Sequence, residues 1–274
     1  MLAPIMSTPS CPSPSEMSCP TPTPIRPLAI VSALHQELAA LLARGHEADF
    51  ERQRHAGRDF LVGQLHGVPV VLVLCGIGKV AAATTATLLA ERFGVGALVF
   101  TGVAGGLGDG VKVGDLVLAD TLLQHDMDAS PLFPRFEVPL TGRSRFPADA
   151  ALTQALATAC EAVLALPQPF GAAAEALGVS RPALHRGLIV SGDRFVGAAS
   201  ECAALRQALP DALAVEMEGA ALAQACHDLG LPFAVLRSIS DRADDSAHVD
   251  FMRFIDEVAS RASAAIVDGW LSAR

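Results

Sequence analysis

Three carboxylates lie at or just after the end of an apolar stretch of the chain: Glu37, Glu218 and Asp241. Two carboxylates can divide acid and base catalysis between them, provided that an apolar environment raises the pKa of the one that must donate a proton at neutral pH. Each also has a simpler interpretation as a charge at a helix start, where Asp and Glu favour the first turn. Their joint placement at one edge of a sheet would favour the catalytic interpretation.

The apolar stretches before these carboxylates have the length and composition of buried strands. Helical patterns begin at or close to two of the carboxylates, over Gln36–Arg44 and Gly219–Leu229. In an α/β sheet, ligands usually bind at the carboxyl ends of the strands. The three predicted strands are Leu28–Leu34, Ala212–Val215 and Pro232–Ile239.

Two further strand ends carry residues suited to holding a ligand. Phe195 follows the predicted strand Gly187–Ser191, and the glycine-rich loop Gly102–Gly106 follows Ala97–Thr101. A dinucleotide-binding fingerprint would need a helix after such glycines, whereas the sequence predicts another strand over Asp115–Thr121. We therefore expect the loop to approach a ligand closely or to bend tightly.

Another glycine-rich turn, Gly76–Lys79, joins a predicted strand to a predicted helix. A nucleoside triphosphate loop would need Ser or Thr after the lysine and a glycine further upstream, but the chain has Val80 and Val73 there. The sequence therefore excludes such a loop.

The remaining patterns also alternate between strands and helices, and no repeat of fixed period is visible. His66-Gly67 is a plausible hairpin turn between two strands, residues 122–148 are irregular and rich in proline, and a helical turn is possible at Ala172–Leu177. This alternation predicts one α/β domain. The further strands are Phe60–Leu65 and Val68–Cys75, and the further helices are Val80–Phe93, Asp149–Leu166, Glu201–Leu209 and Asp250–Leu271.

Composition limits the possible partners and the compartment. The chain has 274 residues, 51% of them hydrophobic, and a net charge of −9, so it can build a large core but offers no basic surface for nucleic acid. Six scattered cysteines indicate reduced thiols in a cytoplasmic protein, and no apolar run is long enough for a membrane span. Residues 1–26 are crowded with Pro, Ser and Thr and are predicted to be a disordered tail before a domain over 27–274.

Five segments of the chain resemble motifs of the nucleoside phosphorylase/nucleosidase superfamily. Their order and spacing are most similar to the bacterial 5′-methylthioadenosine/S-adenosylhomocysteine nucleosidases, and the similarity extends over residues 28–272. The resemblance implies a single-domain three-layer α/β/α sandwich around a mixed central sheet. The segments are Cys75–Ala83, Thr101–Gly106, Val190–Val196, Ala214–Gly219 and Arg237–Asp241.

The resemblance implies hydrolysis of the N-glycosidic bond of 5′-methylthioadenosine and S-adenosylhomocysteine, in methionine salvage and methyl-cycle recycling. On the matching positions, Asp241 would protonate the imidazole-ring nitrogen of adenine, and Glu37 would orient and deprotonate the attacking water. Glu218 would hold the ribose hydroxyls and stabilise the cationic sugar that forms as the bond breaks.

Nine further positions are implied to bind the substrate. Phe195 would stack on adenine, Met217 would pack against the sugar, and Ser240 would orient Asp241. The others would line the pocket or bind through the backbone, Glu216 as a supporting contact with the sugar or the pocket wall. These are Ile77, Val103, Ala104, Gly105, Val196 and Glu216.

The resemblance also implies a homodimer in which a loop of the partner helps to close the 5′-side of the nucleoside pocket. No cofactor is expected, and His125 with Asp126 makes an incomplete ligand set for a metal. Two departures bear on the 5′-substituent: Val103 stands where the bacterial enzymes often have Ser, and Pro131–Pro139 replaces the loop that commonly covers the sulfur substituent.

Other functions fit parts of this pattern. Another adenine nucleosidase, for 5′-deoxyadenosine or aminodeoxyfutalosine, would use the same sugar and base contacts. A purine nucleoside phosphorylase would need several arginines around a phosphate, and the best candidates at strand ends are Arg194 and Arg237. A non-catalytic nucleoside-binding protein on the same scaffold would be expected to lack one of the three carboxylates.

Overall fold

A computed structural model describes residues 25–33, 35–43, 49–179, 181–242 and 251–274. Most of the predicted tail, together with Leu34, Arg44 and Asp250 at the ends of predicted elements, lies outside the described residues.

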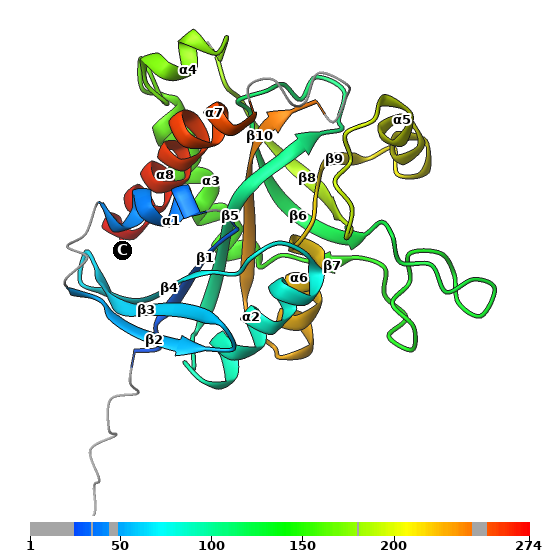
Figure 1. Ribbon diagram of the computed structural model, residues 1–274, viewed down its shortest axis with the longest axis horizontal. Coiled ribbons are helices and arrows are strands. Elements are labelled where there is room, and N and C mark those ends of the chain that lie inside the picture. Colours follow the sequence, from blue (N-terminus) through cyan, green and yellow to red (C-terminus); the bar gives the residue numbers. More distant parts are fainter. Residues whose placement is uncertain (1–24, 34, 44–48, 180, 243–250) are drawn as a thin grey trace, which may run out of the picture.

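The centre of the fold is a mixed sheet of ten strands in the order β10-β6-β8-β9-β5-β1-β4-β3-β2, with the short β7 paired to β6 (Figure 1). Strands β4, β1, β5 and β10 run parallel to one another, and β2 and β3 extend the sheet from β4 as antiparallel hairpin strands. The strands are β1 (Leu28–Ser32), β2 (Glu51–His55), β3 (Arg58–Leu65), β4 (Val68–Leu74), β5 (Ala97–Gly106), β6 (Leu116–Gln124), β7 (Phe146–Pro147), β8 (Leu184–Ser191), β9 (Ala212–Glu216) and β10 (Phe233–Asp241).

Half of the sheet closes on itself. Strand β10 pairs with both β5 and β6, and β9 pairs with both β8 and the far end of β5, so the path β5-β10-β6-β8-β9 returns to β5. Closure requires β5 to be long, since its start pairs with β1 and its end, at Gly105 and Gly106, pairs with Val215 and Ala214. The ends of β9 and β10 are thereby brought to the same stretch of β5.

Helices cover both faces of the sheet (Figure 1). The apolar faces of α1, α3 and α8 pack in one cluster of buried side chains, and those of α2 and α6 pack in a second cluster against the opposite face. The helices are α1 (His35–Leu42), α2 (Lys79–Glu91), α3 (Ala150–Leu164), α4 (Ala172–Ala176), α5 (Ala199–Ala208), α6 (Gly219–Asp228), α7 (Phe251–Phe254), the π-helical turn η2 (Ile255–Ala259) and α8 (Ser260–Ser272). The predicted three-layer architecture with a mixed sheet is confirmed.

The glycine run differs from its prediction. Residues 102–106 are not a loop but the second half of β5, because their backbone continues to pair with β10 and then with β9. A Cβ at Gly102 would lie 3.1 Å from the guanidinium carbon of Arg237, so glycine provides the space for that side chain. At Gly102, the group that approaches the glycine closely is therefore a side chain of the neighbouring strand β10.

Three other elements were missed or displaced. The β2 strand was not predicted because Glu51-Arg-Gln-Arg-His55 is polar and half exposed, so it has no apolar alternation. The region predicted to be irregular contains the end of β6 and the short β7. The single C-terminal helix is interrupted by the π-helical turn η2.

Candidate active site

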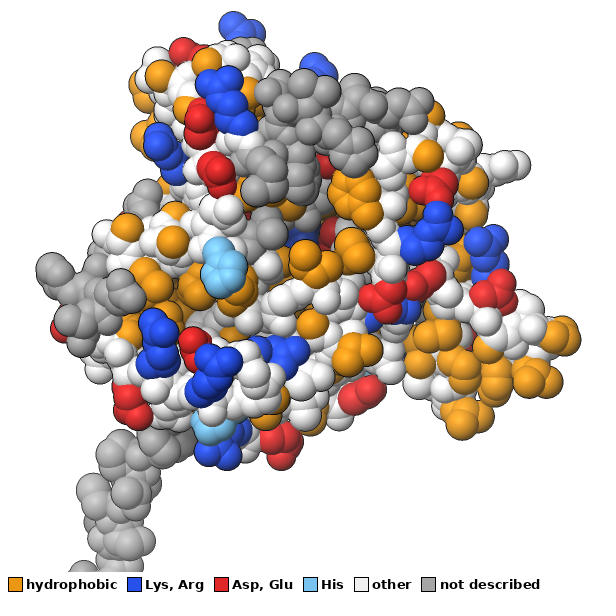
Figure 2. Space-filling view, viewed as in Figure 1, with side chains coloured by type: hydrophobic (Ala, Val, Ile, Leu, Met, Phe, Trp, Pro, Cys, Tyr) orange, Lys and Arg blue, Asp and Glu red, His pale blue; other side chains and the backbone are white. Residues whose placement is uncertain are grey.

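A pocket lies where the ends of β9 and β10 meet β5. Figure 2 shows it as a hollow bordered by hydrophobic side chains. All the predicted site residues except Glu37 line this pocket. The lining residues are Ala33, Ile77, Val103, Ala104, Gly105, Arg194, Phe195, Val196, Val215, Glu216, Met217, Glu218, Ser240 and Asp241.

Glu218 projects into the pocket from the start of α6 and is only 6% exposed. Its Oε1 accepts a hydrogen bond of 2.8 Å from the backbone N–H of Gly78, on the turn before α2. Burial, followed by the negative charge of Glu216, raises the pKa of Glu218 to about 7. A carboxyl group with this pKa exchanges its proton near neutral pH and responds to any positive charge placed beside it.

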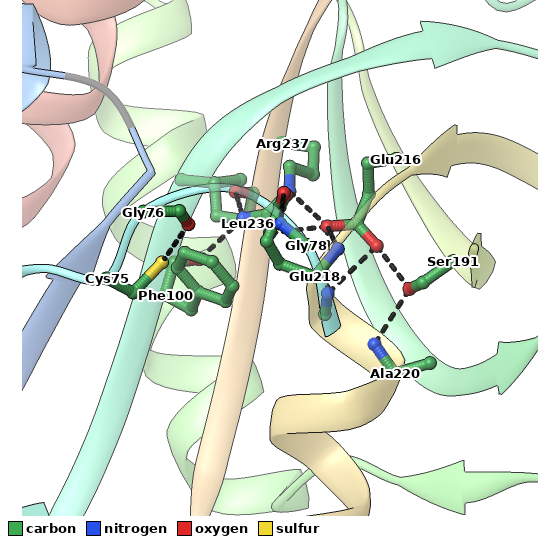
Figure 3. Close-up of polar contacts among 11 residues, drawn as sticks. Cys75, Gly76, Gly78, Phe100, Ser191, Glu216, Glu218, Ala220, Leu236 and Arg237 are labelled. Atoms are coloured by element: carbon green, nitrogen blue, oxygen red, sulfur yellow. Dashed lines mark hydrogen bonds and ion pairs between the residues drawn. The ribbon is translucent and has the colours of Figure 1, made fainter. Parts of the chain in front are cut away.

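Glu216 lies two residues earlier and points away from the solvent, into an ion pair with Arg237 (Figure 3). The Nη2 of Arg237 is 2.7 Å from Oε2 of Glu216, and both side chains are almost fully buried. The Arg237 guanidinium also donates to the carbonyl groups of Phe100 and Leu236 and lies 4.1 Å from the centre of the Phe100 ring. Each charge of the pair is therefore compensated inside the protein.

The rest of the Glu216 carboxylate is saturated by the start of α6. The backbone N–H of Gly219 donates to both carboxylate oxygens at 2.9 Å, and the N–H of Glu218 donates to one at 3.2 Å. Ser191 donates a short hydrogen bond from its hydroxyl and accepts one from the N–H of Ala220 (Figure 3). Glu216 thus borders the pocket, but its carboxylate is committed to internal contacts that hold the chain leading to Glu218.

Asp241 is the last residue of β10 and is 5% exposed. The hydroxyl of Ser240 donates to Oδ2 of Asp241 at 2.8 Å and lies 3.4 Å from the carbonyl oxygen of Ala104. The serine therefore fixes the orientation of the carboxyl group, as expected from the sequence. Asp241 and Glu218 reach the same pocket from different strands.

Glu37 is placed differently from the other two carboxylates. It lies in the first turn of α1, is 0% exposed, and its Oε1 accepts a hydrogen bond of 3.0 Å from Ser263 of α8. It does not line the pocket, although Ala33 on the same connection does. Glu37 thus lies in the interface between α1 and α8, outside the set of residues that line the pocket.

The remaining predicted binding residues form two walls of the pocket. Phe195 and Val196 come from the turn after β8, where Phe195 is 47% exposed. Val103, Ala104 and Gly105 contribute another part of the lining from β5, and Ile77 and Met217 complete it. A pocket that combines an exposed aromatic ring with apolar strand residues suits a flat ring system.

Sequence reasoning missed Ser191 and the structural role of Arg237. The signal for Arg237 was present, because a single arginine within the apolar stretch Pro232–Ile239 must be buried, and a buried cation needs a buried anion. Nothing local identifies Glu216 as that anion, since 21 residues separate the two.

The described part of the chain contains neither a candidate metal cluster nor a helix suited to span a membrane. No group of three or more His, Cys, Asp or Glu side chains there is arranged to hold a metal ion. None of the described helices combines the length and apolar character needed to cross a bilayer. The four described cysteines are buried thiols, and burial raises the pKa of three of them to about 12: Cys75, Cys160 and Cys226.

Comparison with known proteins agrees with this arrangement. The family model for the phosphorylase superfamily matches residues 27–271. The chain belongs to this superfamily. It is 37% identical, over 252 residues, to a 5′-methylthioadenosine/S-adenosylhomocysteine nucleosidase of Mycobacterium bovis, covering 88% of this chain and 95% of that protein.

Solved structures of superfamily members have the same fold. A 5′-methylthioadenosine/S-adenosylhomocysteine nucleosidase from Streptococcus pneumoniae with the transition-state inhibitor MT-ImmA superimposes with a TM-score of 0.75 at 34% identity, over 90% of this chain and 98% of that one. A Helicobacter pylori enzyme with 5′-methylthioadenosine in its active site gives a TM-score of 0.77 at 30% identity, over 91% and 99%. The resemblance predicted from the five motifs is confirmed.

Loss of Arg237 should destabilise the fold strongly. An Arg237→Met substitution keeps the apolar bulk but leaves Glu216 buried without its countercharge, so the free energy of unfolding should fall by about 3–5 kcal/mol. The matched control is Arg145→Met, which breaks the exposed pair with Asp211 and should cost less than about 1 kcal/mol. Urea unfolding measures both, and equal losses would contradict the assigned role of the buried pair.

Glu218 should make stability depend on pH. Its folded-state pKa of about 7 exceeds the ordinary 4.5, so ionisation costs stability progressively as the pH rises from 4.5 to 7. A Glu218→Gln variant, whose amide oxygen can still accept from Gly78, should therefore gain stability relative to the wild type on going from pH 5 to pH 8, by about 2 kcal/mol. Thermal unfolding at the two pH values tests this; a stability difference independent of pH would disprove the raised pKa.

Proposed function

We propose that this chain hydrolyses the N-glycosidic bond of 5′-methylthioadenosine and of S-adenosylhomocysteine, giving adenine and a 5-thioribose product. The observation that carries the proposal is that Asp241 and Glu218, both buried, line one pocket together with the exposed ring of Phe195. The named activity of the relatives at 36–37% identity supports the choice of substrate.

In this reaction Asp241 is the general acid. As the bond between the sugar carbon and the base nitrogen breaks, its electron pair goes to adenine, and Asp241 gives or shares a proton at the imidazole ring so that the base leaves neutral. The Ser240 hydroxyl supports this role because its hydrogen bond to Oδ2 orients the carboxyl group at the pocket.

Glu218 stabilises the sugar. The ribose hydroxyls would bind its carboxylate, and the positive charge that develops on the sugar as the base leaves would be attracted to it. The raised pKa of Glu218 fits this role. The positive charge that develops on the sugar would favour the ionised form of the Glu218 carboxyl group as the base leaves. The Gly78 hydrogen bond fixes one oxygen of the carboxylate and so orients the group in the pocket.

Glu37 activates the water. Its carboxylate would accept the proton of the water whose oxygen bonds to the sugar carbon, which completes the addition of water across the broken bond. Its hydrogen bond with Ser263 supports a fixed orientation. Its complete burial would keep bulk solvent away from this carboxylate.

Hydrolysis is favoured over phosphorolysis by the distribution of arginines. Arg194 is the one basic residue among those lining the pocket, and its side chain is 75% exposed and paired with Glu201. Arg237 is committed to Glu216. A phosphate site needs several convergent cationic groups, which these described residues do not supply.

The pocket of one chain is open on the side of Ile77, which is 64% exposed. We propose a homodimer in which the partner covers this side through the loop between β6 and β7, where Leu132 and Leu140 are 84% and 90% exposed. Sedimentation of the active enzyme tests this, because a fully active monomer would refute it. A cytoplasmic location, methionine salvage and the extent of the domain, residues 27–274, complete the proposal.

The substrate assignment is tested by measuring adenine release from four nucleosides in phosphate-free buffer. We expect release from 5′-methylthioadenosine and S-adenosylhomocysteine, because the base and sugar contacts need no phosphate. Preference for 5′-deoxyadenosine or aminodeoxyfutalosine would favour another adenine nucleosidase, which Val103 and the Pro131–Pro139 loop make a real alternative. A strict requirement for phosphate would overturn hydrolysis.

Substitution of the two carboxylates that transfer protons, Asp241 and Glu37, should affect turnover and inhibitor binding in different ways. Asp241→Asn should lower kcat by at least about 100-fold, because the leaving group loses its proton donor. Glu37→Gln should also turn over very slowly, but it should still bind a transition-state-like inhibitor with nearly the affinity of the wild type. Turnover and calorimetric binding distinguish the two, and an Asp241→Asn enzyme with nearly full turnover would rule out the acid role.

A further inference from the structure

Three segments that are far apart in the sequence meet beside the pocket. They are the turn Gly76–Lys79 before α2, the end of β6 at Gln124–Asp126, and the turn Gly192–Val196 after β8. The first segment carries the amide that binds Glu218, and the third carries Phe195. The contacts that hold these three segments together therefore also position the amide that binds Glu218 and the ring of Phe195.

A ring of polar contacts joins the three segments. The Nζ of Lys79 is 2.7 Å from Oδ1 of Asp126, and the other oxygen of Asp126 accepts from the backbone N–H of Asp193 at 2.9 Å. The Asp193 carboxylate then accepts from the backbone N–H of Lys79 at 2.8 Å, which closes the ring. Lys79 also donates to the buried Gln124 at 3.2 Å.

The Lys79–Asp126 pair within the ring is partly shielded from solvent. The side chains of Lys79 and Asp126 are 18% and 30% exposed, so their contact is less screened than a surface pair. Burial alone would raise the pKa of Asp126, but the hydrogen bonds from Lys79 and Asp193 outweigh it and hold the pKa below its ordinary value. Asp126 therefore stays ionised and paired at neutral pH.

The glycines of the two turns allow this close approach. A Cβ at Gly78 would lie 3.1 Å from Oδ1 of Asp193, and a Cβ at Gly192 would lie 2.5 Å from the His125 ring. Gly78 also has φ of 95°, where a side chain would be strained. The amide of Gly78, which precedes the clamped amide of Lys79 by one residue, is the one that donates to Glu218.

We propose that Lys79, Asp126 and Asp193 form a clamp of positioning residues, which aims the Gly78 amide at Glu218 and holds the turn of Phe195 against the pocket. None of the three lines the pocket, so they act through groups that do. The catalytic consequence of the clamp rests on the proposed function, because it assumes that Glu218 holds the sugar and Phe195 the base. The clamp would thus determine how tightly the nucleoside is bound.

Steady-state kinetics test this consequence. Asp193→Ala removes the acceptor for the Lys79 amide and should raise KM for 5′-methylthioadenosine about tenfold and lower kcat about threefold, since Glu218 and Phe195 are misplaced but the acid Asp241 is not. Asp193→Asn keeps an acceptor oxygen and should recover most of the loss. Asp109→Ala, an exposed aspartate on the turn before β6, is the matched control and should behave like the wild type.

The link between Lys79 and Asp126 is tested by a double-mutant cycle. Lys79→Met and Asp126→Asn should each raise KM severalfold, and the double variant should be little worse than either, because both break the same contact. Lys112→Met is the control for loss of an exposed lysine. Additive effects of the two substitutions would show that Lys79 and Asp126 do not act together and would overturn the clamp.

Hydrogen exchange tests the clamp without any reference to activity. In Asp193→Ala, amides of the segments 76–79 and 192–196 should exchange about tenfold faster, while the β3–β4 hairpin is unchanged. Unchanged exchange in the two turns, or faster exchange spread over the whole chain, would overturn the proposal. If the wild type releases no adenine from any nucleoside, the proposed function fails, and the exchange experiment still decides whether the clamp exists.

Discussion

The structure around the pocket depends on one buried ion pair, Glu216 with Arg237. Charges excluded from water must be compensated by neighbouring groups, and the Glu216 carboxylate obtains this from Arg237, the Ser191 hydroxyl and the amides at the start of α6. These groups belong to the ends of β8 and β9, to the middle of β10 and to the start of one helix. The contacts that neutralise Glu216 therefore fix the relative positions of these elements. They also fix the turn from β9 into α6, on which Glu218 lies.

The same pair sets the electrostatics of the site. The negative charge of Glu216 raises the pKa of Glu218, while Arg237 and the Gly78 amide oppose that shift, and burial remains the largest cause. Burial and the fixed charges around Glu218, rather than solvent, therefore determine its pKa. Asp241, oriented by Ser240, lies in the same pocket on another strand, so two carboxyl groups with different neighbours can take different roles.

Local sequence patterns predicted much of the fold and of the site. Apolar runs of strand length, ended by carboxylates or glycines, predicted β1, β4, β8, β9 and β10 to within a few residues, because burial of the strands leaves a clear apolar signal. The motifs predict that Asp241, Glu218 and Phe195 share one site, and in the structure all three line one pocket. The polar strand β2 and the continuation of β5 through its glycines gave no such signal, since edge exposure and pairing partners are not local properties.

The sequence by itself therefore determined which residues end the strands, the mixed α/β architecture and the identity of the carboxylates. Only the tertiary structure decided how these ends meet. The closed path β5-β10-β6-β8-β9 brings β9 to the far end of β5 and pairs the two strands antiparallel. A simple parallel sheet contains no such pairing. The tertiary structure also decided that Glu216 faces Arg237 while Glu218 faces the pocket, and that Glu37 is buried against Ser263, outside the pocket lining. Those assignments depend on contacts between residues tens to hundreds of positions apart, whose energy comes from burial and charge compensation in the folded state.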